Sequence, residues 1–154
     1  QGNVGRTGAG DVQVMSAGSG IIHSEFNVEA EETRLFQIWI LPDGHVGTPS
    51  WGTKPFPKTE RDGRWEILAS GFAQDSDALP IRAQARVVSA TLPKGAQLDY
   101  ALGKDRKAYL VPATGSVTIE GVRVGARDGA AIAQTDVIQI HAEEESELVL
   151  VDVA

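Results

Sequence analysis

The chain has 154 residues, of which 42% are hydrophobic and 23% are charged, a composition typical of a globular protein and not of a disordered one. Its formal net charge of -7 opposes association with phosphate backbones and anionic lipids, so we expect neither nucleic-acid binding nor membrane binding. The absence of cysteine excludes disulfides, thiolate metal sites and a cysteine nucleophile, and it is compatible with a cytoplasmic protein.

The first half of the sequence predicts few strands. Apolar residues predict strands at residues 12–15, 33–41 and 65–69, and the proline-rich residues 42–57 predict an irregular connection. Three strands are too few for an independent barrel. We therefore expect residues 1–79 to be the later part of a domain whose opening strands precede Gln1.

The second half, residues 80–154, predicts one strand after another. Turn signals such as Pro93-Lys94-Gly95 and Glu120-Gly121 separate short apolar runs, and the second of these suits a two-residue hairpin. The predicted strands are residues 86–92, 96–102, 107–112, 116–119, 122–124, 130–133, 136–142 and 147–153. About eight short strands at close spacing predict an all-β sandwich or barrel, with a domain boundary at 79/80.

A glycine-rich segment in the first half carries the candidate chemistry. Residues 10–25 read GDVQVMSAGSGIIHSE, so a short strand is followed by a Gly-Ser-Gly turn and then by His23 and Glu25. On a strand, a spacing of two residues places both side chains on one face. Imidazole and carboxylate together suit a divalent transition metal, although spacing alone favours an exposed ion pair.

This segment resembles the signature of the pirin family, in which a Gly-Asp-Val-Gln strand precedes a Gly-x-Gly turn and His-Ser-Glu. Further stretches resemble the family's later strands, its proline-rich linker and its second domain: residues 35–40, 49–51, 56–57, 109–111 and 128–130. The resemblance implies a bicupin fold, in which each domain is a double-stranded β-helix or jelly-roll barrel. The expected chain is then one complete C-terminal cupin, residues 80–154, after part of an N-terminal cupin, residues 1–79.

The resemblance also implies a metal site. Pirins bind a metal through a His-x-His pair and a later His and Glu, and this later pair corresponds to His23 and Glu25 as metal ligands. Iron is the expected metal, with nickel, manganese or copper as alternatives. The chain contains no His-x-His, which we expect in a missing segment before Gln1.

Two functions follow from the resemblance. The first is a flavonol dioxygenase of the quercetin 2,3-dioxygenase type, with a flavonol-like substrate and Glu25 as a catalytic base. The alternative is a non-enzymatic, metal-responsive module that binds proteins or co-regulates transcription.

The remaining conspicuous residues are expected to have structural roles. Trp39, Trp51 and Trp65 are expected to pack in cores or between domains, although they could also line a flavonol pocket. His45 and His141 are expected to be exposed or locally hydrogen-bonded, and not to bind metal. We also expect Met15 in a core, and Arg34 and residues 58–64 on the surface.

Overall fold

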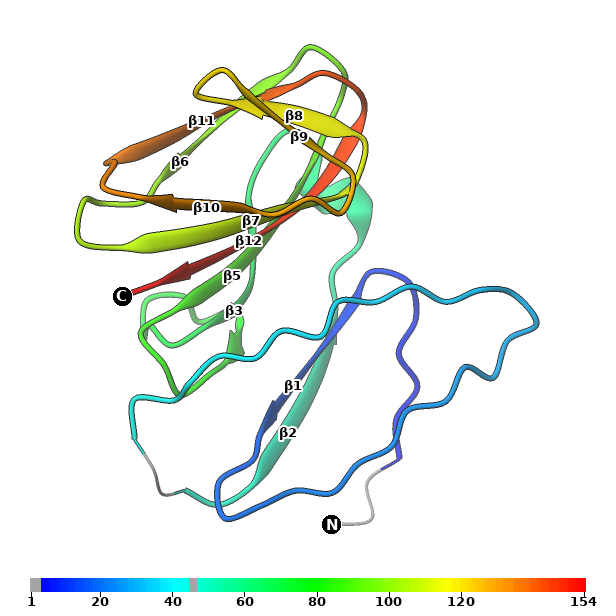
Figure 1. Cartoon of the computed structure of the whole chain (residues 1–154). Coiled ribbons are helices and arrows are strands. Elements are labelled where there is room, and N and C mark those ends of the chain that lie inside the picture. Colours follow the sequence, from blue (N-terminus) through cyan, green and yellow to red (C-terminus); the bar gives the residue numbers. More distant parts are fainter. Residues whose placement is uncertain (1–3, 45–46) are drawn as a thin grey trace.

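The computed structural model describes residues 4–44 and 47–154, and its regular structure is almost entirely β (Figure 1). A single 3-10 turn, η1 (Lys58–Arg61), is the one helical element of these residues. No helix in this part of the chain is long and apolar enough to cross a membrane. The strands are β1 (Asp11–Ser16), β2 (Ser50–Pro55), β3 (Glu66–Ser70), β4 (Leu79–Pro80), β5 (Arg86–Leu92), β6 (Gln97–Ala101), β7 (Lys107–Thr114), β8 (Ser116–Ile119), β9 (Val122–Gly125), β10 (Ala130–Ala133), β11 (Val137–Ala142) and β12 (Ser146–Val153).

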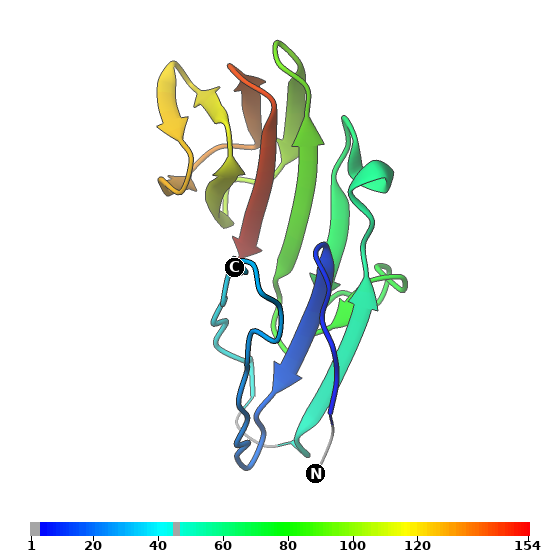
Figure 2. The same cartoon turned by 90° about the vertical axis from the view of Figure 1, so that its right-hand side faces the viewer.

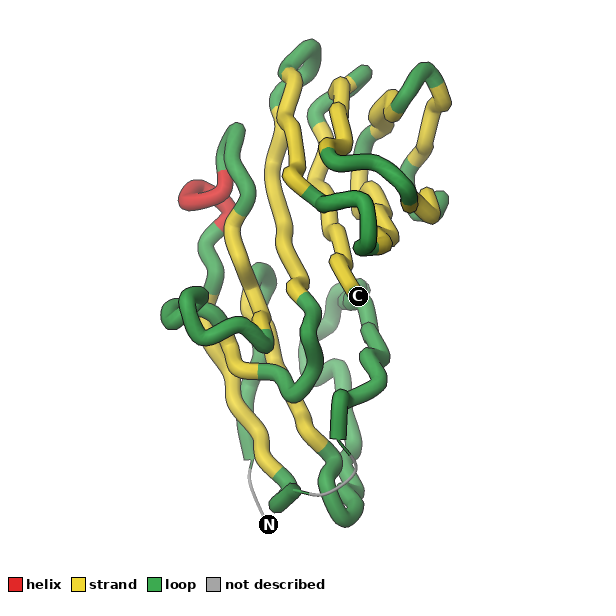
Figure 3. The backbone as a smooth tube through the Cα atoms, turned by 90° about the vertical axis from the view of Figure 1, so that its left-hand side faces the viewer, coloured by secondary structure: helices red, strands yellow, loops and turns green. Residues whose placement is uncertain are grey.

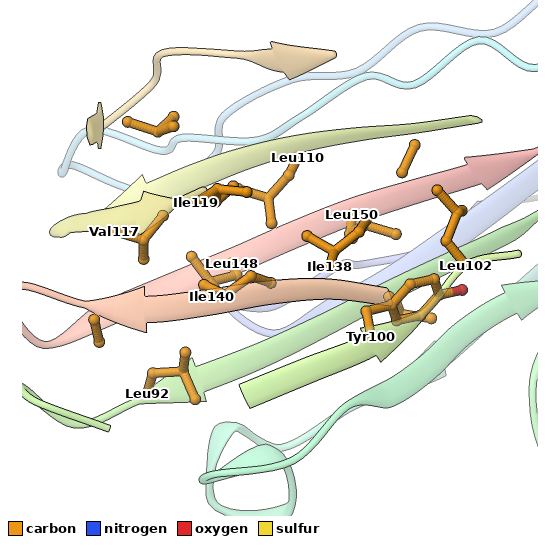
Figure 4. Close-up of a cluster of buried hydrophobic side chains, with 14 residues drawn as sticks. Leu92, Tyr100, Leu102, Leu110, Val117, Ile119, Ile138, Ile140, Leu148 and Leu150 are labelled. Carbon is orange, nitrogen blue, oxygen red and sulfur yellow. The ribbon is translucent and has the colours of Figure 1, made fainter. Parts of the chain in front are cut away.

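Two sheets enclose the main core. The larger has the strand order β10-β7-β12-β5-β3-β4 and the smaller has the order β6-β11-β8-β9. Side chains from both sheets meet between them, among them Leu110, Ile140 and Leu150, each of which is fully buried (Figure 4). The non-consecutive strand orders mean that the chain crosses repeatedly between the sheets, as in a jelly roll.

A second core lies on the opposite face of the larger sheet. Strands β1 and β2 form a separate antiparallel pair, with Met15 opposite Trp51, beside this sheet (Figure 2). The second core contains Phe56, Leu68, Ala69, Leu79 and Val87, and it is flanked by Val12, Val14, Ile40, Ile81, Val149 and Val151. Strand β12 therefore sends alternate side chains to two cores, as the period of two in a strand requires.

The second half of the sequence folds as predicted. Each of the eight strands expected between residues 86 and 153 is present, with ends that differ by at most two residues. The predicted hairpin at Glu120-Gly121 is confirmed, because Ile119 pairs with Val122. Both turn residues have positive φ, 48° for Glu120 and 77° for Gly121, which is typical of a type I′ turn.

The first half differs from the prediction at two places. The predicted strand at residues 33–41 is wrong, because this stretch has no strand partner and most of it is exposed. Conversely, residues 50–55 of the supposed irregular connection form β2, whose six residues pair along β1. The strands predicted at 12–15 and 65–69 are confirmed as β1 and β3. The boundary at 79/80 remains a prediction.

The tract at residues 58–64 is exposed as predicted, with the exception of Arg61. Arg61 is only 8% exposed, and its Nη1 donates a hydrogen bond of 2.8 Å to Ser89 Oγ on β5. Among the described residues, no acidic side chain forms an ion pair with it, and its buried Nε has no hydrogen-bond partner. The charged composition of residues 58–64 predicts exposure for the whole tract. It does not indicate that one arginine of the tract is buried against β5.

A stacked cluster of charges, which we call the Phe72 clamp, ties the loop at 71–85 to the barrel. The guanidinium carbons of Arg86 and Arg106 lie 4.4 Å and 5.3 Å from the centre of the Phe72 ring. Arg86 Nε donates to Asp75 Oδ2 at 2.6 Å, and Arg106 Nε donates to Asp152 Oδ1 at 2.6 Å.

Burial and hydrogen bonding set the ionisation of this cluster. Asp152 is 1% exposed and also accepts a hydrogen bond of 2.8 Å from Tyr100 Oη. Burial is the main cause that raises the pKa of the Tyr100 phenol, and the adjacent Asp152 raises it further. The hydrogen bond from Arg86 is the main cause that lowers the pKa of Asp75, against an opposing effect of burial.

We expect Asp75→Asn to lower the free energy of unfolding by about 1–3 kcal/mol at neutral pH, because it removes a charge-assisted hydrogen bond. A carboxyl whose pKa is lower in the folded state stabilises the fold above its unfolded pKa, near 4, and loses this effect as pH falls through the folded value. The difference between the two proteins should therefore shrink in acid. Urea unfolding over a series of pH values measures it. The exposed Asp105 provides the control Asp105→Asn, which should change little; a pH-independent loss for Asp75→Asn would contradict the role of its charge.

Candidate metal-binding segment

The glycine turn after β1 has the geometry that its sequence predicts. Gly18 and Gly20 both have positive φ, 53° and 131°, and Gly20 N donates to the Ala17 carbonyl at 2.8 Å. A Cβ on Gly18 would lie 2.1 Å from the Gly47 carbonyl oxygen, so a larger residue would clash with the backbone there. This turn directs the chain away from β1 toward His23.

The expected strand at His23 and Glu25 is absent. Residues 17–49 contain no strand within their described part (Figure 3), and the side chains of His23 and Glu25 are exposed. The physical reason is pairing. A strand needs a hydrogen-bonded neighbour, and none of the described strands pairs with residues 21–25. The expectation that a strand places His23 and Glu25 on one face is therefore wrong for this structure.

The described residues do not complete a metal site around this pair. Across residues 4–44 and 47–154, no group of three or more His, Cys, Asp or Glu side chains is placed to hold a metal ion. A metal site needs three or four protein ligands. The donor types of His23 and Glu25 suit a transition metal, but these residues by themselves do not fit a complete site.

The segment that contains the candidate ligands carries exposed apolar side chains, which we call the apolar strip. So many large apolar side chains in water within one segment make this segment a candidate interaction surface. Its members have exposed fractions between 41% for Ile38 and 101% for Ile22. The strip consists of Ile22, Phe26, Val28, Leu35, Phe36, Ile38, Trp39 and Leu41.

Residues 27–33 are held by local polar contacts and not by strand pairing. Asn27 Nδ2 donates to the Glu31 carbonyl at 2.7 Å, and its Oδ1 accepts from Glu29 N and Thr33 Oγ1, both at 3.0 Å. Glu29 also pairs with Arg6. Side-chain bonds of this kind are typical of turns and not of sheets.

The other candidate residues have mixed outcomes. Trp51 and Trp65 are half-buried, as packing roles require, whereas Trp39 is 87% exposed and lies in no core of the described residues. Its packing between domains stays a prediction. Met15 is half-buried on β1 but belongs to neither core cluster, unlike Val12 and Val14, so its expected place in a core is wrong. His141 is exposed on β11, as predicted, and His45 lies outside the described residues.

Comparisons with protein families match most of the chain, with residues 41–66 between the two matches. Residues 67–153 match the model described as "Quercetinase C-terminal cupin domain", and residues 1–40 match the model described as "Pirin". The first of these confirms the cupin fold expected for the second half. The Pirin match includes the glycine turn, His23 and Glu25.

Individual relatives agree with the family models. A "Pirin-like protein" of Caulobacter vibrioides is 63% identical over 153 residues, which are 99% of this chain and 66% of that protein. The "Quercetin 2,3-dioxygenase" of Escherichia coli K12 is 34% identical over 98% of this chain and 64% of its own length. This chain thus spans about two thirds of the length of these relatives.

A solved structure shows the same fold. The crystal structure of the bacterial pirin YhhW from Escherichia coli, in complex with nickel(II), superposes with a TM-score of 0.87 at 32% identity. The match covers 99% of this chain and 65% of that one.

The open apolar strip predicts how the tryptophans respond to a neutral quencher. We expect Trp39→Phe to remove the largest share of the acrylamide-quenchable fluorescence, because Trp39 is 87% exposed while Trp51 and Trp65 are half-buried. Stern–Volmer plots of this variant and of the control Trp51→Phe measure the two shares. A larger loss with Trp51→Phe would show that the strip is covered.

Proposed function

Because this chain belongs to the pirin family, we propose that it forms part of a metal-dependent dioxygenase that acts on flavonols, of the quercetin 2,3-dioxygenase type. The observation that carries this proposal is the Pirin-matched segment with its glycine turn, His23 and Glu25. The Escherichia coli relative, named quercetin 2,3-dioxygenase, supports the flavonol substrate.

We assign His23 and Glu25 as two ligands of a divalent transition metal. The nickel(II) in the related pirin structure supports a divalent metal. Iron is our first choice, followed by nickel, manganese and copper, since imidazole and carboxylate donors suit all four. Two further imidazoles are assigned to a His-x-His pair in a segment outside this chain, because the described residues supply no third ligand.

The apolar strip supports the same assignment. Ile22 flanks His23, so an incoming segment that brings two imidazoles to His23 and Glu25 would also contact the strip. Burying apolar surface contributes roughly 25 cal/mol per Å² removed from water, which would drive the association. One docking event would thus complete the ligand set and cover the strip.

Glu25 has a second proposed role as a base. When bound, the metal would supply the redox chemistry by which a flavonol reacts with molecular oxygen. A carboxylate beside the substrate can accept the proton of a flavonol hydroxyl. We therefore assign Glu25 both as a ligand and as the acceptor of that proton.

The apolar strip also favours a second candidate function. Large exposed apolar side chains can dock another protein, as in a metal-responsive or co-regulatory module without enzyme activity. In that case, the metal would be retained without turnover of a flavonol.

We expect this chain on its own to bind well under one equivalent of metal. A fusion of the first third of the Caulobacter vibrioides relative to this chain should restore about one equivalent, because it completes the ligand set. His23→Ala in the fusion should weaken metal binding at least tenfold, while His141→Ala, at an exposed histidine on β11, should not. Metal analysis and loss of flavonol absorbance in air, with iron, nickel, manganese or copper, measure both properties.

The outcomes separate the two candidate functions. Turnover lost in His23→Ala and Glu25→Gln supports the dioxygenase. Metal retention without turnover with any of the four metals supports the binding module. One tightly bound equivalent in this chain without the fusion partner would contradict the incomplete site.

A further inference from the structure

A second site lies on the larger sheet, away from the candidate metal ligands. A cavity of about 300 Å³, which we call the Trp65 pocket, opens between the start of β3 and the turn at residues 74–78. Its lining comprises Trp65, Glu66, Ile67, Gln74, Asp75, Ser76, Asp77 and Ala78. None of these belongs to residues 17–49, so the pocket is independent of His23 and Glu25. This volume is at the lower end of the range for small-molecule sites and suits a single ring.

Trp65 provides a fixed aromatic wall. Its Nε1 donates a hydrogen bond of 3.0 Å to the Asp99 carbonyl, and its ring meets that of Tyr100 edge-on at 5.5 Å between centroids, with an interplanar angle of 80°. Tyr100 is in turn fixed by Asp152. The indole is therefore oriented by contacts behind it and needs no ligand to order it.

The polar groups opposite this wall are largely unused. Within the described chain, the side chains of Gln74, Ser76 and Asp77 have no hydrogen-bond or ion-pair partner. Glu66 is half-buried, and its nearest cation is the guanidinium of Arg64 at 4.0 Å. The amide of Gln74, the hydroxyl of Ser76 and the carboxylate of Asp77 are thus free to bind a ligand, and Glu66 has only the long ion pair with Arg64.

The charges around the pocket balance, which favours a neutral ligand. Asp75 is neutralised by Arg86 at 2.6 Å, and Glu66 has Arg64 nearby. Lys54 Nζ donates to the backbone carbonyl of Asp77 at 2.5 Å, so an ammonium lies on the same turn of the chain. Two of the three carboxylates in the lining thus have a guanidinium partner, and an ammonium contacts the backbone of the third residue, so the pocket has little net charge to attract an ion.

We propose that the Trp65 pocket binds a neutral ring that carries vicinal hydroxyl groups, such as a sugar or a catechol. The ring would stack on the indole, and adjacent hydroxyls would donate to the carboxylates of Glu66 and Asp77. The Gln74 amide and the Ser76 hydroxyl can donate or accept at the ring's remaining oxygens. Sugars and catechols share this chemistry, and the test distinguishes them.

The test follows the indole and side-chain amide signals of this chain by nitrogen–proton NMR during titration. Methyl glucoside and catechol are the two probes, and tetramethylammonium chloride is the cationic comparison. We expect saturable shifts of the Trp65 indole, assigned by its loss in Trp65→Phe, and of the Gln74 amide. The Trp39 indole, exposed on the apolar strip, should not move.

Two variants test the polar contacts. Glu66→Gln and Gln74→Ala should each weaken binding by about fivefold to a hundredfold. Glu66→Gln removes the charge of a carboxylate that accepts from a ligand hydroxyl, and Gln74→Ala removes the amide that bonds to a ring oxygen. Glu120→Gln, in the turn of the β8–β9 hairpin, is the matched control and should leave binding unchanged.

Each outcome decides the proposal. Shifts with either diol probe support it, and the probe that binds identifies the source as a glycosyl group or an aromatic diol. Shifts with tetramethylammonium but with neither diol overturn it in favour of a cation site. No saturable shift with any probe also overturns it. The NMR titration needs neither metal nor turnover, so its result tests the Trp65 pocket independently of the dioxygenase proposal.

Discussion

Strands β5 and β12 send alternate side chains to two apolar clusters, and the rest of the structure is arranged around this constraint. Leu148 and Leu150 point into the main core, while Val149 and Val151 border the second one. A sheet buried on both faces needs a cover on each. The smaller sheet covers one face and the β1–β2 pair covers part of the other, so the two halves of the chain share one central sheet.

Sequence patterns predicted the second half well and the first half less well. In residues 86–153, alternating residues and turn signals act locally, and each strand finds its partner within the chain. The stretch at residues 33–41 has the same apolar character but no partner strand, so its pattern did not become a strand. Residues 50–55 became one because β1 offered a free edge, which proline-rich composition does not reveal. The local sequence pattern indicates that a segment can form a strand, and the presence of a partner strand decides whether it does.

The candidate metal ligands illustrate the same limit. The family motif identified His23 and Glu25 from the sequence, and nothing in their exposed surroundings would have singled them out. Conversely, the Trp65 pocket joins residues from β3 and from the turn at 74–78, so its members share no motif. The charge partner of Asp75 lies on β5, as does the buried hydroxyl that accepts from Arg61. Such contacts follow from topology and were not readable from spacing.

The loop that carries the Trp65 pocket is fixed at its base and free at its tip. A Cβ on Gly71 would lie 1.7 Å from the Ala83 carbonyl oxygen, so only glycine fits there, and Asp75 is held by Arg86. Gln74, Ser76 and Asp77, between and beyond these anchors, are exposed, and their side chains form no hydrogen bond or ion pair with the described residues. Mutations at these three positions are therefore nearly neutral for folding. Ligand preference could drift among descendants of this chain, or be selected from a small library, while the barrel beneath stays the same.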